Sequence, residues 1–418
     1  MVCATHSTRR FVRDGRRGPP PGKRYKYTAI KSPHVVDGMG RGNVKNKLQV
    51  GVIGTGRWAG MAHIPGWKRS PLVDLVVVCD IDRDKAQARA KEFDVPDFET
   101  DYQKVLSRRD IDVVDIVTSG DNHEPLTFAA LEAGKHVLVE KPVCHDYKDV
   151  WRAHALATSK KLKTKVGLTF RYAPAMQYMY DLIQDGFVGT PYIFNGWEQN
   201  SQWIDPAVPS RFPRVDTGDA PIKVGSLEGY GAPTIDISLW VVQSRLTSVV
   251  GTLKNFVPKR INPDGSWVRT NVDDGDIYIG EYANGAICSM QSSYVTVGNY
   301  PGIEARVYGS KGALICRLVE EFGECQVLKS ATPEAVEFVE VEVPASYFPV
   351  GYKKGESWRS LFYANLVHNF AKEICDGGET NQGNFAQSAR VQEIINAVER
   401  SHRERRWVDL PLNPGVGD

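Results

Sequence analysis

The sequence lacks the features of several protein classes. No apolar run approaches the ~18 residues of a membrane-spanning helix. The seven cysteines are scattered, odd in number and free of C-x-x-C spacing, which argues against a disulfide framework or a cysteine zinc site. No H-x-x-x-H motif or carboxylate–histidine cluster indicates a metal site. We therefore expect a cytoplasmic protein with no metal and no membrane contact.

Acidic residues are scarce at the N-terminus. Residues 1–50 contain 12 Lys and Arg against 2 Asp and Glu, whereas the rest of the 418-residue chain is mildly acidic. An acidic body gives no support to nucleic-acid binding. Residues 1–46 have no apolar periodicity, so we predict a disordered leader. A solvated extension is the simplest interpretation of this leader, and a transit peptide or a basic tail that binds nucleic acid are alternatives. A twin-arginine export signal is disfavoured because no apolar segment follows the arginines.

A strand, a glycine turn, a helix and a second strand follow the leader. Residues 48–53 (LQVGVI) and 72–79 (LVDLVVVC) have the composition of buried strands, and GTGRWA lies between them. Glycines at positions 54 and 56 would let the backbone approach a pyrophosphate at a helix N-terminus. Asp80 ends the second strand, where an acid that binds ribose hydroxyls is expected, although it could instead cap a helix over 82–93. Because Asp80 would repel a 2′-phosphate, NAD is favoured over NADP.

The alternation of strands and helices continues to about residue 165. Strands are expected at 113–117 and 136–139, and helices at 124–133 and 146–159. Such alternation predicts a parallel sheet with ligands at the carboxyl ends of its strands. Residues 118–123 and Glu140-Lys141-Pro142 fall at two of these ends. Beyond them, an Asn-Gly turn between 276–282 and 286–294, and a second hairpin over 303–316, predict an antiparallel sheet, with helices over 233–242, 359–375 and 385–402.

Five segments together resemble the glucose-fructose oxidoreductase / inositol dehydrogenase / MocA family. They are the glycine turn with His63 downstream, Thr118 with His123, Ala133-Gly134-Lys135-His136-Val137, Glu140-Lys141-Pro142, and Phe170-Arg171-Tyr172-x-Pro174. The resemblance extends from about residue 48 to 411. It implies an α/β chain with a Rossmann domain over 47–165 and an α+β domain with a large, mostly antiparallel sheet over 166–418. It also implies a nicotinamide cofactor, a sugar-like or cyclitol substrate, a cis bond before Pro142 and a homo-oligomer, dimer or tetramer.

The resemblance and the motifs together give a set of expected site residues. We assign cofactor binding to Gly54, Gly56, Arg57, Trp58, Asp80, Thr118, His123, Glu140, Lys141 and Arg171. We assign substrate binding to Lys141, Tyr172, Trp203, Tyr230, Asp236 and Trp240. For the tyrosines and for Trp203, a purely structural role is the alternative. His63 and His123 are expected to orient the backbone near the cofactor. Ser119-Gly120 replaces the usual Pro-Asn, which weakens the case for a side-chain contact to the cofactor there.

Oxidation of a secondary alcohol needs a base for the hydroxyl proton. Lys141, at the edge of the sheet, is the expected catalytic base, oriented by Glu140; a solvated Lys-Pro after a strand is the alternative. Desolvation and a positive nicotinamide would both favour its neutral amine. The resemblance implies a second catalytic residue after Lys141, an aspartate, at Asp236. It also implies a histidine or tyrosine four residues later, where this chain has Trp240. Indole cannot accept a proton, so Trp240 is expected to be a sugar-stacking wall or a core aromatic.

Three functions remain open from the sequence. The first is an NAD-dependent dehydrogenase acting on a ring secondary alcohol of a sugar, glycoside or cyclitol. The second keeps NAD bound and cycles it, as a sugar–sugar oxidoreductase or a redox-neutral glycosidase. The third is a dinucleotide-sensing regulator without enzymatic activity. Trp240 favours the third function, whereas the intact Glu140-Lys141-Pro142 argues against it.

Overall fold

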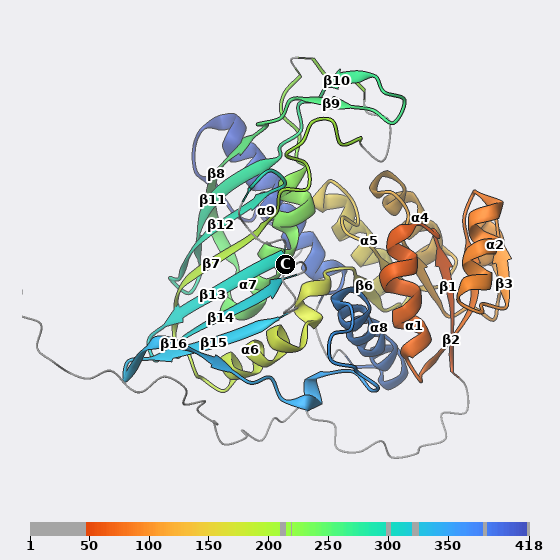
Figure 1. Ribbon diagram of the computed structural model, residues 1–418, viewed down its shortest axis with the longest axis horizontal. Helices are drawn as coiled ribbons and strands as arrows, with labels where there is room; N and C mark the ends of the chain where they lie inside the picture. The colour runs from red at the N-terminus through yellow and green to blue at the C-terminus, as the bar shows by residue number, and fades with distance from the viewer. Residues whose placement is uncertain are drawn as a thin grey trace, which may run out of the picture.

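The chain folds around two β-sheets (Figure 1). The computed structural model describes residues 47–209, 215–218, 220–297, 302–319, 326–378 and 383–415. The predicted disordered leader over 1–46 lies outside the described residues. The predicted fold class, a parallel Rossmann sheet followed by a large and mostly antiparallel sheet, is confirmed.

The first sheet has six parallel strands in the order β3-β2-β1-β4-β5-β6. Its strands are β1 (Leu48–Ile53), β2 (Val73–Cys79), β3 (Asp97–Glu99), β4 (Val113–Ile116), β5 (His136–Val139) and β6 (Thr164–Val166). The central strands are continuous apolar runs because both faces of a parallel sheet are covered. For the same reason β1 and β5 have the bounds predicted from the sequence.

Helices cover both faces of this sheet. They include α1 (Ile64–Arg69), α2 (Arg83–Glu92), α3 (Tyr102–Ser107), α4 (His123–Glu132) and α5 (Tyr147–Ser159). A helix from much later in the chain, α8 (Trp358–Asp376), packs against α1 beside them (Figure 1). Its residues Tyr363, Val367 and Phe370 belong to the same apolar cluster as Val50 and Val52 of β1. The C-terminal region therefore contributes to the core of the first layer.

The second sheet has nine strands in the order β16-β15-β14-β13-β7-β12-β11-β8-β17. All neighbours are antiparallel except β7 and β12. The strands are β7 (Pro191–Gln199), β8 (Leu246–Lys254), β11 (Gly275–Tyr282), β12 (Ile287–Ser293), β13 (Gly302–Gly309), β14 (Ala313–Val319), β15 (Val327–Thr332), β16 (Ala335–Val341) and β17 (Val408–Asp409). The predicted Asn-Gly turn joins β11 to β12.

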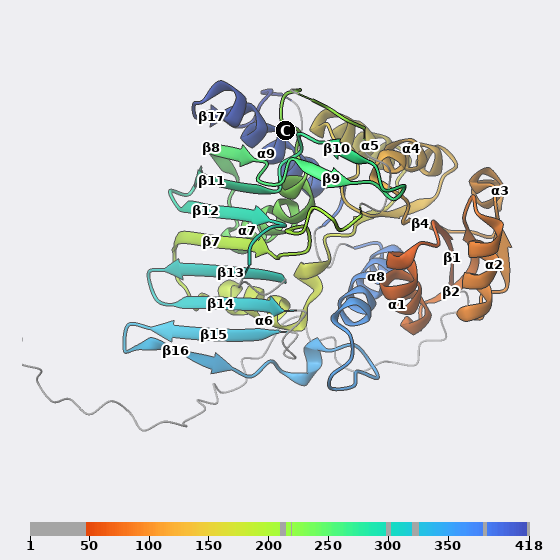
Figure 2. The ribbon, with the colours of Figure 1, turned by 45° about the horizontal axis from the view of Figure 1, so that its top comes forward.

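One face of the large sheet packs on helices and the other does not. Helices α6 (Pro174–Gln184), α7 (Ala232–Val242) and α9 (Phe385–Glu404) lie on the inner face and form the main hydrophobic core with it (Figure 1). On the outer face, Ile277, Ile279 and Ile287 are about half exposed, at 54%, 44% and 50%. The tip of β7 points toward the parallel sheet (Figure 2), so the ends of both sheets meet at one place.

Short elements complete the chain around that meeting point. They are η1 (Ala59–His63), η2 (Gly120–Asn122), η3 (Thr169–Tyr172), η4 (Leu227–Gly231), η5 (Ala345–Tyr347), β9 (Lys259–Ile261) and β10 (Trp267–Arg269). The elements η1 and η4 are single π-helical turns that lead directly into α1 and α7. π-Helical turns occur frequently at functional sites, because they displace side chains from the regular helical positions.

Candidate active site

The turn after β1 has the shape that a phosphate group requires. Gly54 has φ of +99°, and a Cβ there would lie 2.5 Å from the carbonyl oxygen of Val117, so only glycine fits. Gly56 faces open space: a Cβ on it would meet no atom within 4 Å. Arg57 and Trp58 follow at the start of the helical segment, and Arg57 is exposed. The open space beside Gly56 therefore fits a pyrophosphate at a helix N-terminus.

Asp80 lies beside this turn and does not cap the next helix. Its Oδ2 accepts hydrogen bonds from the backbone N–H and the hydroxyl of Thr55, both at 2.9 Å. The cap of α2 is Asp82, whose carboxylate accepts from the backbone N–H groups of Asp84 and Lys85. The helix-cap alternative for Asp80 is therefore wrong, and its carboxylate is held at the carboxyl end of β2 next to the glycine turn.

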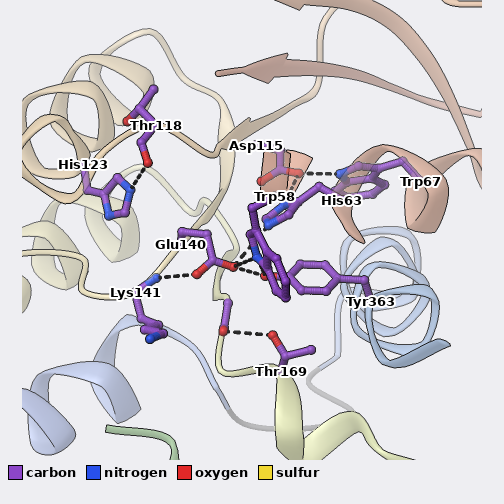
Figure 3. Close-up of polar contacts among 11 residues, drawn as sticks. Trp58, His63, Trp67, Asp115, Thr118, His123, Glu140, Lys141, Thr169 and Tyr363 are labelled. Atoms are coloured by element: carbon purple, nitrogen blue, oxygen red, sulfur yellow. Dashed lines mark hydrogen bonds and ion pairs between the residues drawn. The ribbon is translucent and has the colours of Figure 1, made fainter. Parts of the chain in front are cut away.

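Glu140, just after β5, accepts hydrogen bonds from side chains of two segments, η1 with its N-cap residue and α8, and from the backbone of Lys141 (Figure 3). Its Oε1 accepts from the indole of Trp58 at 3.0 Å and from the phenol of Tyr363, and lies 3.1 Å from Nε2 of His63. Its Oε2 accepts the backbone N–H of Lys141 at 3.2 Å. Burial raises the pKa of Glu140, but the hydrogen bond and charge of His63 outweigh it and hold that pKa below its usual value.

His63 lies between two carboxylates in the interior. Its Nδ1 is 2.8 Å from Oδ2 of Asp115, which also accepts the indole N–H of Trp67 at 2.7 Å. Burial lowers the pKa of His63, but Asp115 and Glu140 together raise it to about 9. An imidazolium at this position compensates both acids and fixes the orientation of Glu140. We expected His63 to orient the backbone, but it contacts the side chains of Asp115 and Glu140 instead.

Lys141 reaches from the end of the first sheet to η4. Its Nζ donates a hydrogen bond to the carbonyl oxygen of Gly229 in η4. The Lys141–Pro142 bond is cis, as expected. His123 lies on the backbone around this loop, with Nδ1 2.7 Å from the carbonyl of Pro142 and Nε2 3.2 Å from that of Thr118 (Figure 3 shows the latter contact). The amine of Lys141 thus lies between the loop after β5 and η4.

Aromatic and amide side chains surround η4 on the side of the large sheet. The hydroxyl of Tyr230 accepts a hydrogen bond from Asn200 and donates one to Gln202 at 3.2 Å. Its ring contacts that of Tyr294 edge-on, with centroids 4.5 Å apart. Trp203 donates its backbone N–H to the carbonyl of Tyr294 at 3.0 Å. Tyr230, Asn200 and Gln202 therefore form one polar, aromatic wall next to Gly229, the residue that binds the amine of Lys141, and Trp203 is bonded to this wall through its backbone.

Asp236 and Arg171, expected to bind different ligands, bind each other. Nε of Arg171 donates to Oδ2 of Asp236 at 2.8 Å and Nη2 donates to Oδ1, with both side chains no more than 1% exposed. The ring of Trp240 lies against this pair, 4.8 Å from the guanidinium carbon, and stacks on Tyr180 at 4.2 Å. Tyr172 is 0% exposed. These four expected site residues therefore form part of the interior behind η4.

The comparisons with known proteins match both halves of the chain. Residues 48–168 match the model of an oxidoreductase family with an NAD-binding Rossmann fold, GFO_IDH_MocA, and residues 176–315 match the GFO/IDH/MocA C-terminal domain. This chain belongs to the GFO/IDH/MocA oxidoreductase family.

Relatives within the GFO/IDH/MocA family include sugar and cyclitol dehydrogenases. Levoglucosan dehydrogenase of Pseudarthrobacter phenanthrenivorans is 26% identical and covers 87% of this chain and 98% of its own. Inositol 2-dehydrogenase of Rubrobacter xylanophilus is 28% identical over 64% of this chain and 71% of its own. Among solved structures, an oxidoreductase domain protein from Kribbella flavida is 27% identical, with a TM-score of 0.78 over 87% of this chain and 99% of its own. A levoglucosan dehydrogenase complex with NADH and levoglucosan is 25% identical, with a TM-score of 0.77 over 88% of this chain and all of its own.

The structure of this GFO/IDH/MocA protein adds residues that sequence reasoning missed. Thr55 holds Asp80, Tyr363 holds Glu140, and Gly229 receives Lys141. Only Thr55 had a signal, since it lies inside the glycine motif. Within the ranges that the structure describes, no group of three or more His, Cys, Asp or Glu is placed to hold a metal ion. In the same ranges, no helix is long and apolar enough to span a membrane.

Proposed function

We propose that this protein is an NAD-dependent dehydrogenase that oxidises a ring secondary alcohol of a sugar, glycoside or cyclitol. The observation that carries the proposal is the position of Lys141. Its amine lies at the carboxyl end of a parallel strand, where such sheets bind ligands, and it reaches across to η4 of the second half. A base for a hydroxyl proton is needed at the same place as the hydride acceptor.

The residues of the first sheet fit a dinucleotide. Gly54 and Gly56 would admit the pyrophosphate, and Asp80 would accept the ribose hydroxyls. The bound dinucleotide supplies the hydride acceptor. Glu140 fixes the backbone of Lys141 by accepting its N–H, and the carbonyl of Gly229 orients the amine. Lys141 then takes the hydroxyl proton of the substrate as its carbinol carbon loses hydride.

Asp80 supports NAD rather than NADP as the cofactor. The carboxylate is held at the end of β2 by two hydrogen bonds from Thr55. A fixed negative charge there would repel a 2′-phosphate but would accept hydrogen bonds from the ribose hydroxyls of NAD. NADP would therefore bind more weakly than NAD.

The substrate class rests on the relatives and on the wall beside Lys141. Levoglucosan and inositol dehydrogenases act on polyhydroxylated rings, as their names state. The hydroxyl of Tyr230 with the amides of Asn200 and Gln202 offers donors and acceptors for ring hydroxyls. Asp236 and Trp240, expected to contact the substrate, would support this wall from behind through Arg171.

The exposed outer face of the large sheet supports a homo-oligomer, dimer or tetramer. Ile277, Ile279 and Ile287 lie side by side on β11 and β12, and a second copy would cover them. Light scattering coupled to size-exclusion chromatography measures the mass. A monomer at micromolar concentration would contradict this part of the proposal.

The decisive experiment measures NADH absorbance with NAD and a panel of sugars, anhydrosugars and cyclitols. Turnover with release of NADH is the expected result. Protein that is purified with NAD and never releases NADH would indicate cofactor cycling instead. NAD binding without turnover on any polyol would contradict the enzymatic proposal and favour a sensor.

A further inference from the structure

Glu198 lies in a row of side chains that crosses the large sheet. The strand register pairs Glu198 of β7 with Ile303 of β13 on one side and with Ser292 of β12 on the other. Ser292 is in turn paired with Asp276 of β11, and Asp276 with Leu253 of β8. All five residues are buried. The row is therefore apolar at both ends and polar only at its three central positions.

This polar part of the row lies under η4. The hydroxyl of Ser292 is 2.9 Å from that of Ser226, the residue that precedes η4. Two residues before Glu198 on the same face of β7, a Cβ on Gly196 would lie 2.6 Å from Thr234 of α7. Glu198 therefore faces the turn whose Gly229 carbonyl accepts the amine of Lys141.

One oxygen of the Glu198 carboxylate is buried without a hydrogen-bond partner among the described residues. This oxygen is Oε2, and the residue is 6% exposed. Its neighbour in the row, Asp276, is instead bonded by the hydroxyl and the backbone N–H of Ser292. A buried polar atom without a partner costs stability and requires an explanation, and functional sites are where such costs are retained.

Lys141 is the charge that acts on Glu198. Burial raises the pKa of Glu198 to about 8, and the nearby ammonium of Lys141 opposes that rise. The other ionisable groups near this space are Glu140 in the loop after β5, Tyr230 in η4, Tyr294 just after β12, Asp273 just before β11, and Asp276 in β11. Glu140 is compensated by His63. Asp273 accepts hydrogen bonds from the backbone N–H groups of residues 225 and 227, but burial outweighs them and raises its pKa to about 7.

We propose that Glu198 receives the net proton of the reaction through Lys141, as a positioning residue that acts on the substrate only by way of that amine. The inference rests on the proposed dehydrogenase function. The O–H bond of the substrate hydroxyl breaks and an N–H bond forms on Nζ of Lys141. Another N–H bond of the same ammonium breaks and an O–H bond forms on Glu198. The carbinol carbon is oxidised to a carbonyl as its hydride is taken up by the dinucleotide, and Glu198 later releases the proton to solvent.

The relay requires an ionised Glu198 before the reaction. In the wild type, we therefore expect kcat/KM to rise as the pH increases through about 8. In Glu198→Gln, Lys141 must lose its own proton to solvent before it can accept another. We expect kcat at neutral pH to fall by about 10²-fold or more, with the rising limb of the profile moved to higher pH and the Kd for NAD unchanged. Glu198→Asp should recover part of the activity.

The matched control is Asp276→Asn, which removes a buried carboxylate from the same row. This carboxylate is bonded by Ser292 and has no part in the relay, so the pH at which activity rises should remain that of the wild type. A Glu198→Gln enzyme with wild-type kcat and pH profile would overturn the relay. The proposed function is tested separately from the relay. Turnover by the wild type that is lost in Lys141 variants would support the dehydrogenase function whatever the result for Glu198→Gln. A wild type without turnover would contradict the dehydrogenase function itself.

A measurement without substrate or cofactor tests the buried charge. Since the pKa of Glu198 is raised on folding, the native state keeps a proton that the unfolded chain has lost above about pH 4.5. The contribution of Glu198 therefore lowers the free energy of unfolding as the pH rises from about 4.5 toward 8, and this loss is complete above pH 8. Glu198→Gln removes this penalty, so its gain in Tm over the wild type should be larger at pH 9 than at pH 5. A pH-independent difference in Tm, or a lower Tm than wild type at pH 9, would overturn the inference.

Discussion

Nε2 of His63 lies 3.1 Å from Oε1 of Glu140, and this ion pair anchors the residue that precedes Lys141. The side chain of His63 is 0% exposed and that of Glu140 is 12% exposed. Asp115 compensates His63 on its other side at 2.8 Å. Because both ring nitrogens face carboxylates, His63 carries its charge at neutral pH, and Glu140 remains an acceptor for the N–H of Lys141.

The first prediction is that His63→Gln destabilises the fold strongly. The change leaves two buried carboxylates without their cation, and removing one partner of a buried pair costs about 3–5 kcal/mol. Urea unfolding at pH 7 measures the loss. The control is Lys47→Ala, which breaks an exposed pair with Asp74 and should cost less than about 1 kcal/mol. Equal losses in the two variants would contradict the assigned role of His63.

The same pair makes stability depend on pH. The pKa of His63 is raised from 6.5 to about 9 in the folded state, so its contribution is complete below pH 6.5 and is lost as the pH rises through 9. The free energy of unfolding of the wild type should therefore fall between pH 6.5 and 9, and that of His63→Gln should fall less. Parallel curves for the two proteins would show that His63 does not titrate as described.

Sequence reasoning located the four central strands of the first sheet, β1, β2, β4 and β5, because each is a short and mostly apolar run covered on both faces. Thus β1 and β5 have the predicted bounds, and Glu140 and Lys141 follow at a carboxyl end. Sequence reasoning missed the three-residue edge strands β3 and β6, which contain no such run. It could not find the partners that arrive from distant parts of the chain. Tyr363 lies 223 positions from Glu140, and no local pattern marks a phenol on a long amphipathic helix.

The pairing of Asp236 with Arg171 shows a second limit of sequence reasoning. Each residue was assigned to a ligand from its local motif, and each is polar in a segment that contributes to the candidate site. Their separation of 65 positions hides the fact that they compensate each other in the interior. Burial and charge pairing are properties of the folded chain, which a local motif does not reveal.

The second prediction separates the two glycines of the turn. In Gly54→Ala, a Cβ would lie 2.5 Å from the carbonyl oxygen of Val117 at a positive φ, so the folded state should lose several °C in Tm. In Gly56→Ala the new methyl group meets no atom within 4 Å, so Tm should remain close to that of the wild type. NAD should nevertheless bind at least tenfold more weakly to Gly56→Ala, because the methyl occupies space assigned to the pyrophosphate. Wild-type NAD affinity in that variant would place the cofactor elsewhere.

The third prediction concerns the choice between NAD and NADP. Asp80→Ser removes the negative charge beside Thr55 but keeps a hydroxyl that can take part in hydrogen bonding. NAD should bind more weakly and NADP more strongly, so the ratio of their Kd values should narrow. Titration of protein fluorescence with each dinucleotide measures both constants. The wild type binding NADP more tightly than NAD would contradict the assignment of Asp80.

The fourth prediction tests the base itself with Lys141→Met. The variant keeps an unbranched side chain of similar length and loses the amine that bonds Gly229. General acid–base catalysis typically contributes about 10²–10⁴-fold, so kcat should fall by that factor while NAD binds as in the wild type, since Gly56 and Asp80 are unchanged. The control is Lys135→Met, which removes another buried lysine whose amine also bonds backbone carbonyls, at 2.6 and 2.8 Å. That variant should lower Tm and leave kcat unaltered. Turnover that survives Lys141→Met would transfer the role of base to another group of the wall, and Tyr230, the residue after Gly229, would be the next candidate.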